Sequence, residues 1–217
     1  MGAPLVTTGE TSPSLAAIVA SVEWADLVPP DIRERTSPDG MMTVAFTDLE
    51  SSTAMMERLG EDRWLELLLD HNRLVREYVE AFRGAVVKSQ GDGFMLVFTS
   101  AAASLAWAVD LQRVLDRYNS GNRDQRLRLR IGMHTGNLFR DGDDFLGKTV
   151  VLAARITGRA RGGEILVSSA LKSYTERLGL WRFGPATEVS LKGLATSQLV
   201  YALDWRSVDA KRPSQND

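Results

Sequence analysis

Residues 42–98 carry the clearest pattern in the chain: MTVAFTDLESSTAMMERLGEDRWLELLLDHNRLVREYVEAFRGAVVKSQGDGFMLVF. The apolar run from Met42 to Thr47 predicts a short strand. From Trp64 to Phe82, apolar residues recur at steps of three and four. This spacing predicts one long amphipathic helix that begins near Ser51 and ends at Gly84.

The end of the same stretch predicts a β-hairpin. Ala85 to Lys88 and Phe94 to Phe98 are short apolar runs, and Gly91-Asp92-Gly93 between them is a turn signal. Beyond it, the pattern predicts helices at 101–118, 148–160 and 170–178 and strands at 127–135, 164–168, 188–191 and 198–203. We therefore expect an α+β fold, a ferredoxin-like βαββαβ palm with extra C-terminal strands and helices packed on a mixed or antiparallel sheet.

Composition and turn-forming residues set the limits of this unit. Pro29-Pro30 and the run at 37–40 separate an N-terminal extension or linker, residues 1–40, from a domain at 41–205 and a tail at 206–217. The net charge of −2 argues against a nucleic-acid-binding protein, and the absence of cysteine excludes disulfides and thiolate metal sites. Without a membrane-length apolar run or a signal peptide, we expect a cytoplasmic protein that does not contact the membrane.

Two carboxylates stand where predicted strands end: Asp48 after the first strand and Asp92 in the hairpin turn. In a ferredoxin-like sheet these strands are neighbours, so the two side chains can meet at one edge. Paired carboxylates, completed by waters and substrate phosphates, suit Mg²⁺. The alternative is that Asp48 caps the helix and Asp92 only forms the turn. The backbone N–H groups of Ser51–Thr53 likewise favour either polyphosphate binding or simple N-capping.

Six motifs in order resemble the catalytic domains of class III adenylyl and guanylyl cyclases, particularly bacterial ones. They are FTDLESST (46–53), KSQGDGF (88–94), IGMHTG (131–136), DDFLGKTVVLAARI (143–156), GGEILVS (162–168) and LKG (191–193). Each is weak alone, but together they cover roughly residues 41–205 with family-like spacing. The resemblance implies an adenylyl cyclase, in which the ribose 3′-hydroxyl of ATP attacks the α-phosphate to give cyclic AMP and pyrophosphate.

The resemblance also implies roles for individual residues. Asp48 and Asp92, with the backbone carbonyl of Leu49, would bind two Mg²⁺ or Mn²⁺ ions per active site. Arg155 would stabilise the transition state. Substrate contacts are expected from Lys88, Asp144, Ser52, Thr53 and Lys192.

The pair Lys88 and Asp144 favours adenine over guanine. A lysine can donate to adenine N1 and an aspartate can accept from the exocyclic amine, whereas guanine presents the reverse pattern. Without the family, a solvated lysine and a loop acid would be the ordinary interpretation. The family further implies a head-to-tail homodimer, in which the metal ligands of one chain face Lys88, Asp144 and Arg155 of the other. No regulatory partner is indicated.

Val151 departs from the family pattern, because many members carry an asparagine one helical turn before the arginine. Valine cannot donate or accept that hydrogen bond, so the alternative is a weakly active or inactive cyclase-homology domain that binds nucleotide and dimerises. The absence of a GG[D/E]EF hairpin argues against a diguanylate cyclase. We interpret His71 as a satisfied core histidine and His134 as structural. Arg126, Arg128 and Arg130 are interpreted as a solvated strand face, with contact to phosphate or a partner as the alternative.

Overall fold

The computed structural model describes residues 14–15, 41–142, 144–191 and 196–207. Most of the predicted extension, most of the predicted tail and Lys192 therefore lie outside the described residues. Leu15 is 2 % exposed and belongs to the main hydrophobic core. None of the helices in the described ranges is long and apolar enough to cross a membrane.

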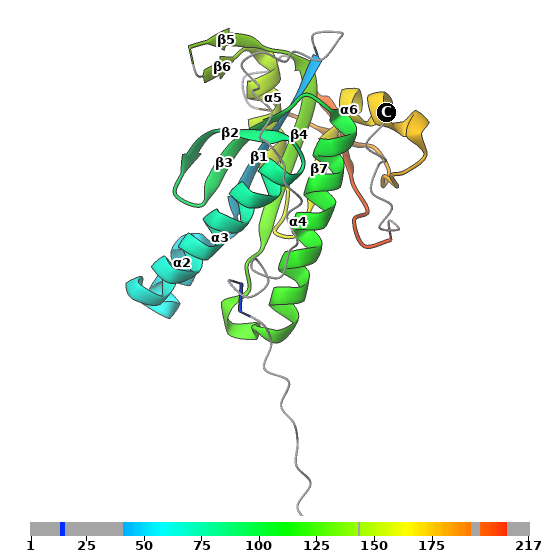
Figure 1. Ribbon diagram of the computed structural model, residues 1–217. Helices are drawn as coiled ribbons and strands as arrows, with labels where there is room; N and C mark the ends of the chain where they lie inside the picture. Colours follow the sequence, from blue (N-terminus) through cyan, green and yellow to red (C-terminus); the bar gives the residue numbers. More distant parts are fainter. Residues whose placement is uncertain (1–13, 16–40, 143, 192–195, 208–217) are drawn as a thin grey trace, which may run out of the picture.

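The predicted βαββαβ order is confirmed, and a seven-stranded sheet forms the centre of the molecule (Figure 1). The strands lie in the order β2-β3-β1-β4-β7-β9-β8. Their bounds are β1 Met41–Leu49, β2 Gly84–Gln90, β3 Gly93–Phe98, β4 Leu129–Asn137, β7 Ile165–Ser168, β8 Thr187–Val189 and β9 Gln198–Ala202. β1 is antiparallel to both β3 and β4, whereas β4 and β7 are parallel, so the sheet is mixed.

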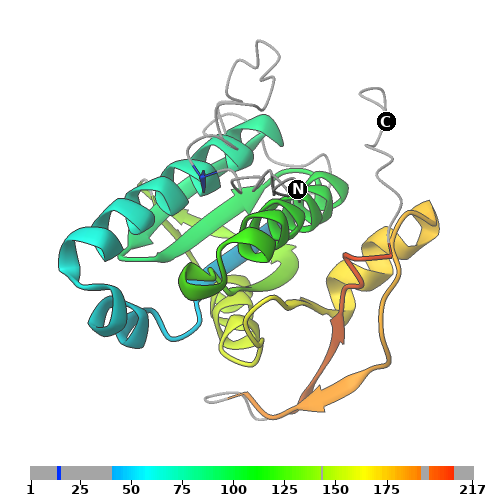
Figure 2. The same cartoon turned by 90° about the horizontal axis from the view of Figure 1, so that it is seen from below.

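Helices cover both faces of the sheet. The long helices α3 (Glu61–Ala81) and α4 (Ala101–Gly121) lie together on one face, and α5 (Lys148–Thr157) lies on the other (Figure 2). Along β1, Ala45 and Leu49 face α3 and α4, while Val44 packs on the α5 side with Ala153. This alternation is expected for a strand buried on both faces. The short helix α6 (Ser169–Thr175) contributes Leu171 to the core under α4.

The single long helix predicted before the hairpin is wrong. The structure has α2 (Ser52–Leu59) and α3, separated at Gly60, whose φ of 80° and ψ of 158° are incompatible with a helix. α3 ends at Ala81, and Gly84 instead begins β2. A Cβ at Gly84 would lie 2.4 Å from the Phe98 ring, so glycine is required there for close packing between β2 and β3.

A two-stranded hairpin that the sequence analysis did not predict projects from the sheet. It consists of β5 (Phe139–Asp141) and β6 (Asp144–Leu146), paired antiparallel. The Asp141-Gly142 pair is a turn signal that could have revealed it. The hairpin matters because it carries Asp144.

Two glycines of β4 let α5 approach the sheet closely. A Cβ at Gly132 would lie 2.1 Å from the backbone nitrogen of Thr157, and one at Gly136 would lie 2.7 Å from Thr149 Oγ1. Four strand residues span about 13 Å and eight helical residues about 12 Å, so the two contacts coincide in spacing. Thr149 Oγ1 donates to the Asn137 carbonyl at 2.6 Å, and Thr157 Oγ1 donates to the Phe46 carbonyl at 3.3 Å.

We expect Gly132→Ala to destabilise the fold by about 3 kcal/mol, because the added methyl would overlap the backbone of α5 and force the helix away from β4. Urea denaturation followed by circular dichroism measures the effect. Gly158→Ala is the matched control, since a Cβ there meets nothing closer than 3.6 Å. Equal stability of the two variants would contradict the close approach.

Candidate active site

Asp48 and Asp92 lie at the same end of neighbouring strands. Asp48 is the penultimate residue of β1, and Asp92 occupies the turn between β2 and β3. The backbone N–H of Leu49 donates to Asp92 Oδ2 at 3.1 Å, which ties the turn to β1. A Cβ at Gly93 would lie 3.3 Å from the Thr47 carbonyl and 4.0 Å from Asp48 Oδ1. The structure therefore brings the two predicted carboxylates together.

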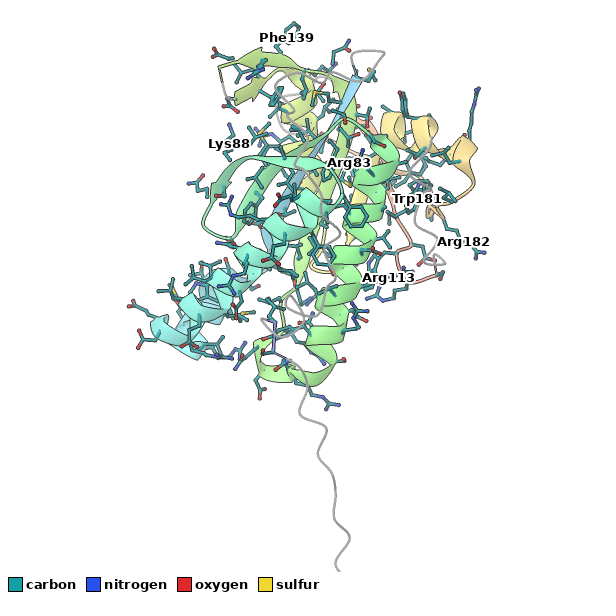
Figure 3. All side chains as sticks on the ribbon, in the orientation of Figure 1. Arg83, Lys88, Arg113, Phe139, Trp181 and Arg182 are labelled. Carbon is teal, nitrogen blue, oxygen red and sulfur yellow. The ribbon has the colours of Figure 1, made fainter. Side chains whose placement is uncertain are left out.

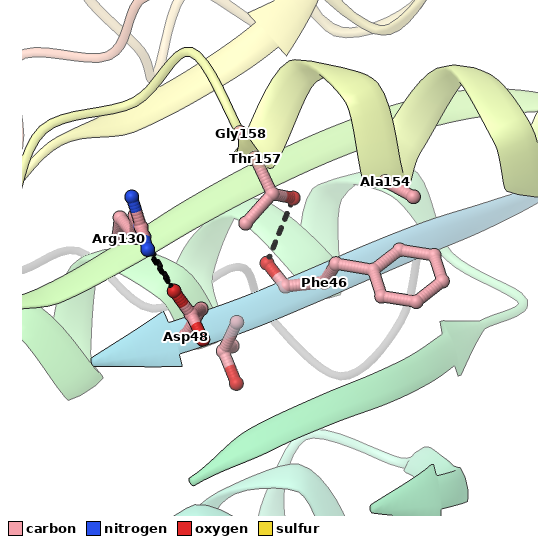
Figure 4. Close-up of a pocket in the computed structure, with 7 residues that line it drawn as sticks. Phe46, Asp48, Arg130, Ala154, Thr157 and Gly158 are labelled. Carbon is pink, nitrogen blue, oxygen red and sulfur yellow. Dashed lines mark hydrogen bonds and ion pairs between the residues drawn. The ribbon is translucent and has the colours of Figure 1, made fainter. Parts of the chain in front are cut away.

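Arg130, which was not predicted as a site residue, lies next to Asp48. Asp48 and Arg130 are register partners on β1 and β4. Arg130 Nε donates to Asp48 Oδ2 at 2.6 Å, and its terminal nitrogen contacts the same oxygen (Figure 4). Arg128 likewise pairs with Glu50 at 2.9 Å. The interpretation of these arginines as a solvated face is wrong for Arg130, which is partly buried against Asp48, whereas Arg126 and Arg128 are exposed as predicted.

A pocket of 290 Å³ opens beside this ion pair, between the ends of β1 and β4 and the last turn of α5 (Figure 4). Its lining residues are Phe46, Thr47, Asp48, Arg130, Ala154, Thr157 and Gly158. The pocket thus combines one carboxylate, one guanidinium and an apolar wall. This combination suits a charged group attached to a less polar body.

The residues at this edge fit a pair of divalent cations. Asp48 and Asp92 supply hard carboxylate oxygens, and the chain at Leu49 runs between them. No cluster of three or more His, Asp or Glu side chains is present in the described ranges. Magnesium bound through one or two carboxylates takes its remaining ligands from water and substrate phosphates, so a pair is sufficient.

Lys88 reaches its position through a β-bulge. Val86 lies opposite Leu96 and Lys88 lies opposite Met95, so the register shifts between Val86 and Lys88. Leu96 packs toward α3 and α4, whereas Met95 packs on the α5 side. Opposed residues share a face. The bulge therefore turns Lys88 to the α5 side, whereas a regular strand would send it to the α3 side.

On the α5 side Lys88 meets Asp144 of the β5–β6 hairpin. Lys88 Nζ lies 3.0 Å from Asp144 Oδ1 and 2.7 Å from Oδ2. The hydrogen bond from Lys88, followed by the one from the Phe145 backbone N–H, lowers the pKa of Asp144 below its ordinary value. Lys88 points outward from β2 in Figure 3, and both side chains are accessible. The structure thus joins two residues that are 56 positions apart.

Arg155 lies on the exposed side of α5, and Val151 lies one turn before it. The buried side of α5 carries Leu152, Ala153 and Ile156. Val151 is 45 % exposed, so it does not serve the core of the single chain.

The N-terminus of α2 places Ser52 and Thr53 in the first turn. Its N-cap residue Ser51 has a left-handed φ of 61°, and no side chain of the described residues caps the helix. The Ser51 side chain therefore does not cap the helix, which was the alternative considered from the sequence. The first-turn N–H groups remain available as donors.

Both histidines were predicted to be structural, and only His71 differs from that prediction, in its hydrogen bonding. His71 is buried as predicted, but its Nε2 has no hydrogen-bond partner among the described residues, so it is not fully satisfied by them. Burial lowers the pKa of His71 to about 4, against opposing effects of Asn72 and Asp92. His134 Nδ1 lies 2.8 Å from Ser168 Oγ. Burial, and then the charge of Lys148, lower the pKa of His134 to about 4.

Comparisons with known proteins agree with this geometry. Residues 35–204 match the family model of the adenylate and guanylate cyclase catalytic domain. The adenylate cyclase of Podospora anserina is 32 % identical over 168 residues, which are 66 % of this chain and 8 % of that protein. An uncharacterized protein of Mycobacterium tuberculosis is 32 % identical over 181 residues, 82 % of this chain and 46 % of its own length. The chain thus spans less than half the length of these relatives.

Solved structures show the same fold. The adenylyl cyclase CyaB from P. aeruginosa superimposes with a TM-score of 0.68 at 22 % identity, over 79 % of this chain and 95 % of that one. The guanylyl cyclase Cya2 gives 0.66 at 21 % identity, over 79 % and 97 %. Both specificities thus occur on this fold. The mixed sheet, the carboxylates at its edge and the family match over residues 35–204 together show that the chain belongs to the adenylate and guanylate cyclase catalytic domain family.

Proposed function

We propose that this chain is an adenylyl cyclase that converts ATP to 3′,5′-cyclic AMP and pyrophosphate in a homodimer. The observation that carries the choice of base is the Lys88–Asp144 pair, in which one donor and one acceptor stand side by side on the α5 face. Adenine needs a donor for N1 and an acceptor for its amine. Guanine would bring N1–H and O6 against groups of the wrong kind.

The carboxylates of Asp48 and Asp92 would hold two Mg²⁺ or Mn²⁺ ions, with the Leu49 carbonyl between them. When bound, the cations would increase the nucleophilicity of the 3′-hydroxyl and offset charge on the phosphates. For the cations to bind, Asp48 must exchange its partner Arg130, whose guanidinium is then free to pair with the triphosphate in the same pocket. The N–H groups of Ser52 and Thr53 would donate to phosphate oxygens.

In the proposed reaction the 3′-oxygen forms a bond to the α-phosphorus, and the bond from that phosphorus to the bridging oxygen breaks. The hydroxyl proton is released, and pyrophosphate leaves with the bonding electrons. Arg155 would act on the charge that grows at the transition state, which favours that state over bound ATP. The protein's own contribution is thus positioning and charge neutralisation.

Two observations support a dimer. First, the pocket at Asp48 is lined by none of Lys88, Asp144 and Arg155, so one chain offers the two halves of a site separately. Second, Phe139, Leu146 and Val151 are exposed apolar side chains on the segment that carries Asp144 and Arg155; Phe139, labelled in Figure 3, is 73 % exposed. A second copy that covers this surface would bring its Asp48 and Asp92 to the partner's Lys88, Asp144 and Arg155.

A weakly active, nucleotide-binding dimerisation domain is the second candidate. Val151 favours it, because an exposed valine one turn before Arg155 cannot hydrogen-bond to ribose or phosphate. Losing one positioning donor costs about 10²–10³ in rate, which leaves a measurable enzyme. An absence of cyclic AMP when the purified chain is assayed at high concentration with Mn²⁺ and ATP would favour this second candidate.

The base preference is tested by assaying ATP and GTP side by side in wild type and Lys88→Glu. We expect wild type to prefer ATP. In Lys88→Glu the donor to N1 becomes an acceptor, so the ratio of ATP to GTP turnover should fall by about 10²-fold.

The matched control for that change is Arg126→Glu, which makes the same charge reversal at an exposed position. Its ATP-to-GTP ratio should equal that of wild type. A wild type that prefers GTP, or an unchanged ratio in Lys88→Glu, would refute the adenine assignment.

A further inference from the structure

Helix α3 contacts the β2–β3 hairpin, whose turn carries Asp92. Asn72 Nδ2 donates to the Gly91 carbonyl at 3.3 Å, and Asn72 Oδ1 lies 3.1 Å from His71 Nδ1. One turn later, Arg76 donates to Ser89 Oγ at 2.9 Å. α3 therefore holds the hairpin both in β2 and in the turn itself, directly before Asp92.

The pair His71 and Asn72 has a defined polarity. Because the Asn72 amide nitrogen donates to Gly91, its oxygen faces the imidazole, so His71 Nδ1 must carry the proton. His71 Nε2 is then a buried acceptor with no partner in the part of the chain that the structure describes. Leaving such an acceptor unpaired costs roughly 1–3 kcal/mol, a cost that an apolar side chain at this core position would avoid. The imidazole packs near the Phe94 ring, as an apolar side chain could, but only a hydrogen-bonding side chain can also orient the Asn72 amide.

The bond from Asn72 adds a constraint to the Asp92 turn beyond the Gln90–Gly93 pair that closes it. Gly91 has a φ of 61°, and a Cβ added there would meet no atom of the described residues within 4 Å. Packing against neighbours therefore does not fix the conformation of Gly91. On the other side, Asp92 Oδ2 is tied to the Leu49 N–H. Asn72 therefore holds the carbonyl of the peptide that leads into Asp92, and the Leu49 N–H holds the Asp92 carboxylate. Because the hydrogen bond from Leu49 uses Oδ2 of Asp92, the other oxygen, Oδ1, is available to a cation.

We propose that Asn72, oriented by His71, is a positioning residue that sets the Asp92 carboxylate for cation binding. The proposal rests on the proposed function of Asp92 as a cation ligand. Residues that orient a ligand from outside the coordination shell contribute about 10–100-fold to metal affinity. Asn72 acts on the ligand through one backbone carbonyl, so we expect an effect at the lower end of this range.

The test is a Mn²⁺ titration of the full chain without nucleotide, followed by the electron paramagnetic resonance signal of free Mn²⁺. We expect Asn72→Leu to weaken Mn²⁺ binding about tenfold. Asn119→Leu is the matched control, because Asn119 likewise uses both amide atoms in hydrogen bonds, here to the Leu127 N–H and carbonyl, but lies on α4 away from the turn. It should lose stability and keep wild-type affinity for Mn²⁺.

Two variants of His71 separate orientation from packing. His71→Asn keeps a donor near the position of Nδ1 and should retain Mn²⁺ affinity, whereas His71→Leu should lose it as Asn72→Leu does. Equal affinity in Asn72→Leu, Asn119→Leu and wild type would overturn the proposal while leaving the metal site intact. If wild type binds no Mn²⁺, or if Asp92→Ala binds it as wild type does, the metal site itself is refuted.

Discussion

Asp92→Ala is expected to abolish formation of cyclic AMP, with turnover of ATP reduced by at least about 10³-fold. The carboxylate is one of the two proposed cation ligands at the sheet edge, and the other, Asp48, is paired with Arg130. Without Asp92, the cations that would hold the attacking hydroxyl near the triphosphate lose one of their two carboxylate ligands. The measurement is cyclic AMP formed by purified protein with Mn²⁺ and ATP.

Two further variants show whether the loss comes from the charge or from the fold. Asp92→Asn keeps an oxygen that can accept from the Leu49 N–H, so the turn stays in place. We expect it to fold as wild type does and to remain inactive. Asp116→Ala removes an exposed carboxylate on α4 and should leave turnover unchanged. Wild-type product from Asp92→Ala would refute the role of the carboxylate pair.

The second large effect concerns the division of the site between two chains. Arg155→Ala alone should lower turnover by about 10²–10³-fold, since the arginine is proposed to act on transition-state charge. Mixing it with Asp92→Ala should restore activity. Of the two sites in a mixed dimer, one combines the intact Asp92 of one chain with the intact Arg155 of the other. A random mixture should therefore recover about a quarter of the wild-type rate.

The control for complementation is a mixture of Asp92→Ala with Asp48→Ala. Both substitutions remove a ligand from the same half of the site, so every dimer contains two broken halves and should stay inactive. Recovery in this control, or no recovery in the first mixture, would contradict the trans arrangement. Sedimentation velocity on both mixtures establishes that mixed dimers form.

Much of the fold follows from local periodicity. The strand at 42–47 and the hairpin around Asp92 were predictable because burial repeats along the chain. The break at Gly60 was not found, because apolar spacing continues across it. The residue-by-residue register between strands that are distant in the sequence could not be predicted. The register of β1 and β4 that sets Arg130 on Asp48 leaves no trace in either segment alone.

The same distinction applies to the site. Asp48 and Asp92 were predictable as neighbours because the topology puts their strands side by side. The contact of Lys88 with Asp144 came only from the family resemblance, since the sequence shows neither the bulge in β2 nor the β5–β6 hairpin. Arg130 and Asn72 could not be assigned from residue type, because an arginine on a strand and an asparagine on a helix are ordinary surface residues.

The way α5 is fixed on β4 has a consequence for the proposed dimer. The helix meets the strand through Thr149 at one end and Thr157 at the other, and each contact is too close to allow sliding. Arg155 therefore travels with the whole sheet as a single rigid body. In the proposed homodimer, a rotation of one protomer against its mate by a few degrees would therefore change the gap between Arg155 and the triphosphate held by the mate without any rearrangement inside either protomer.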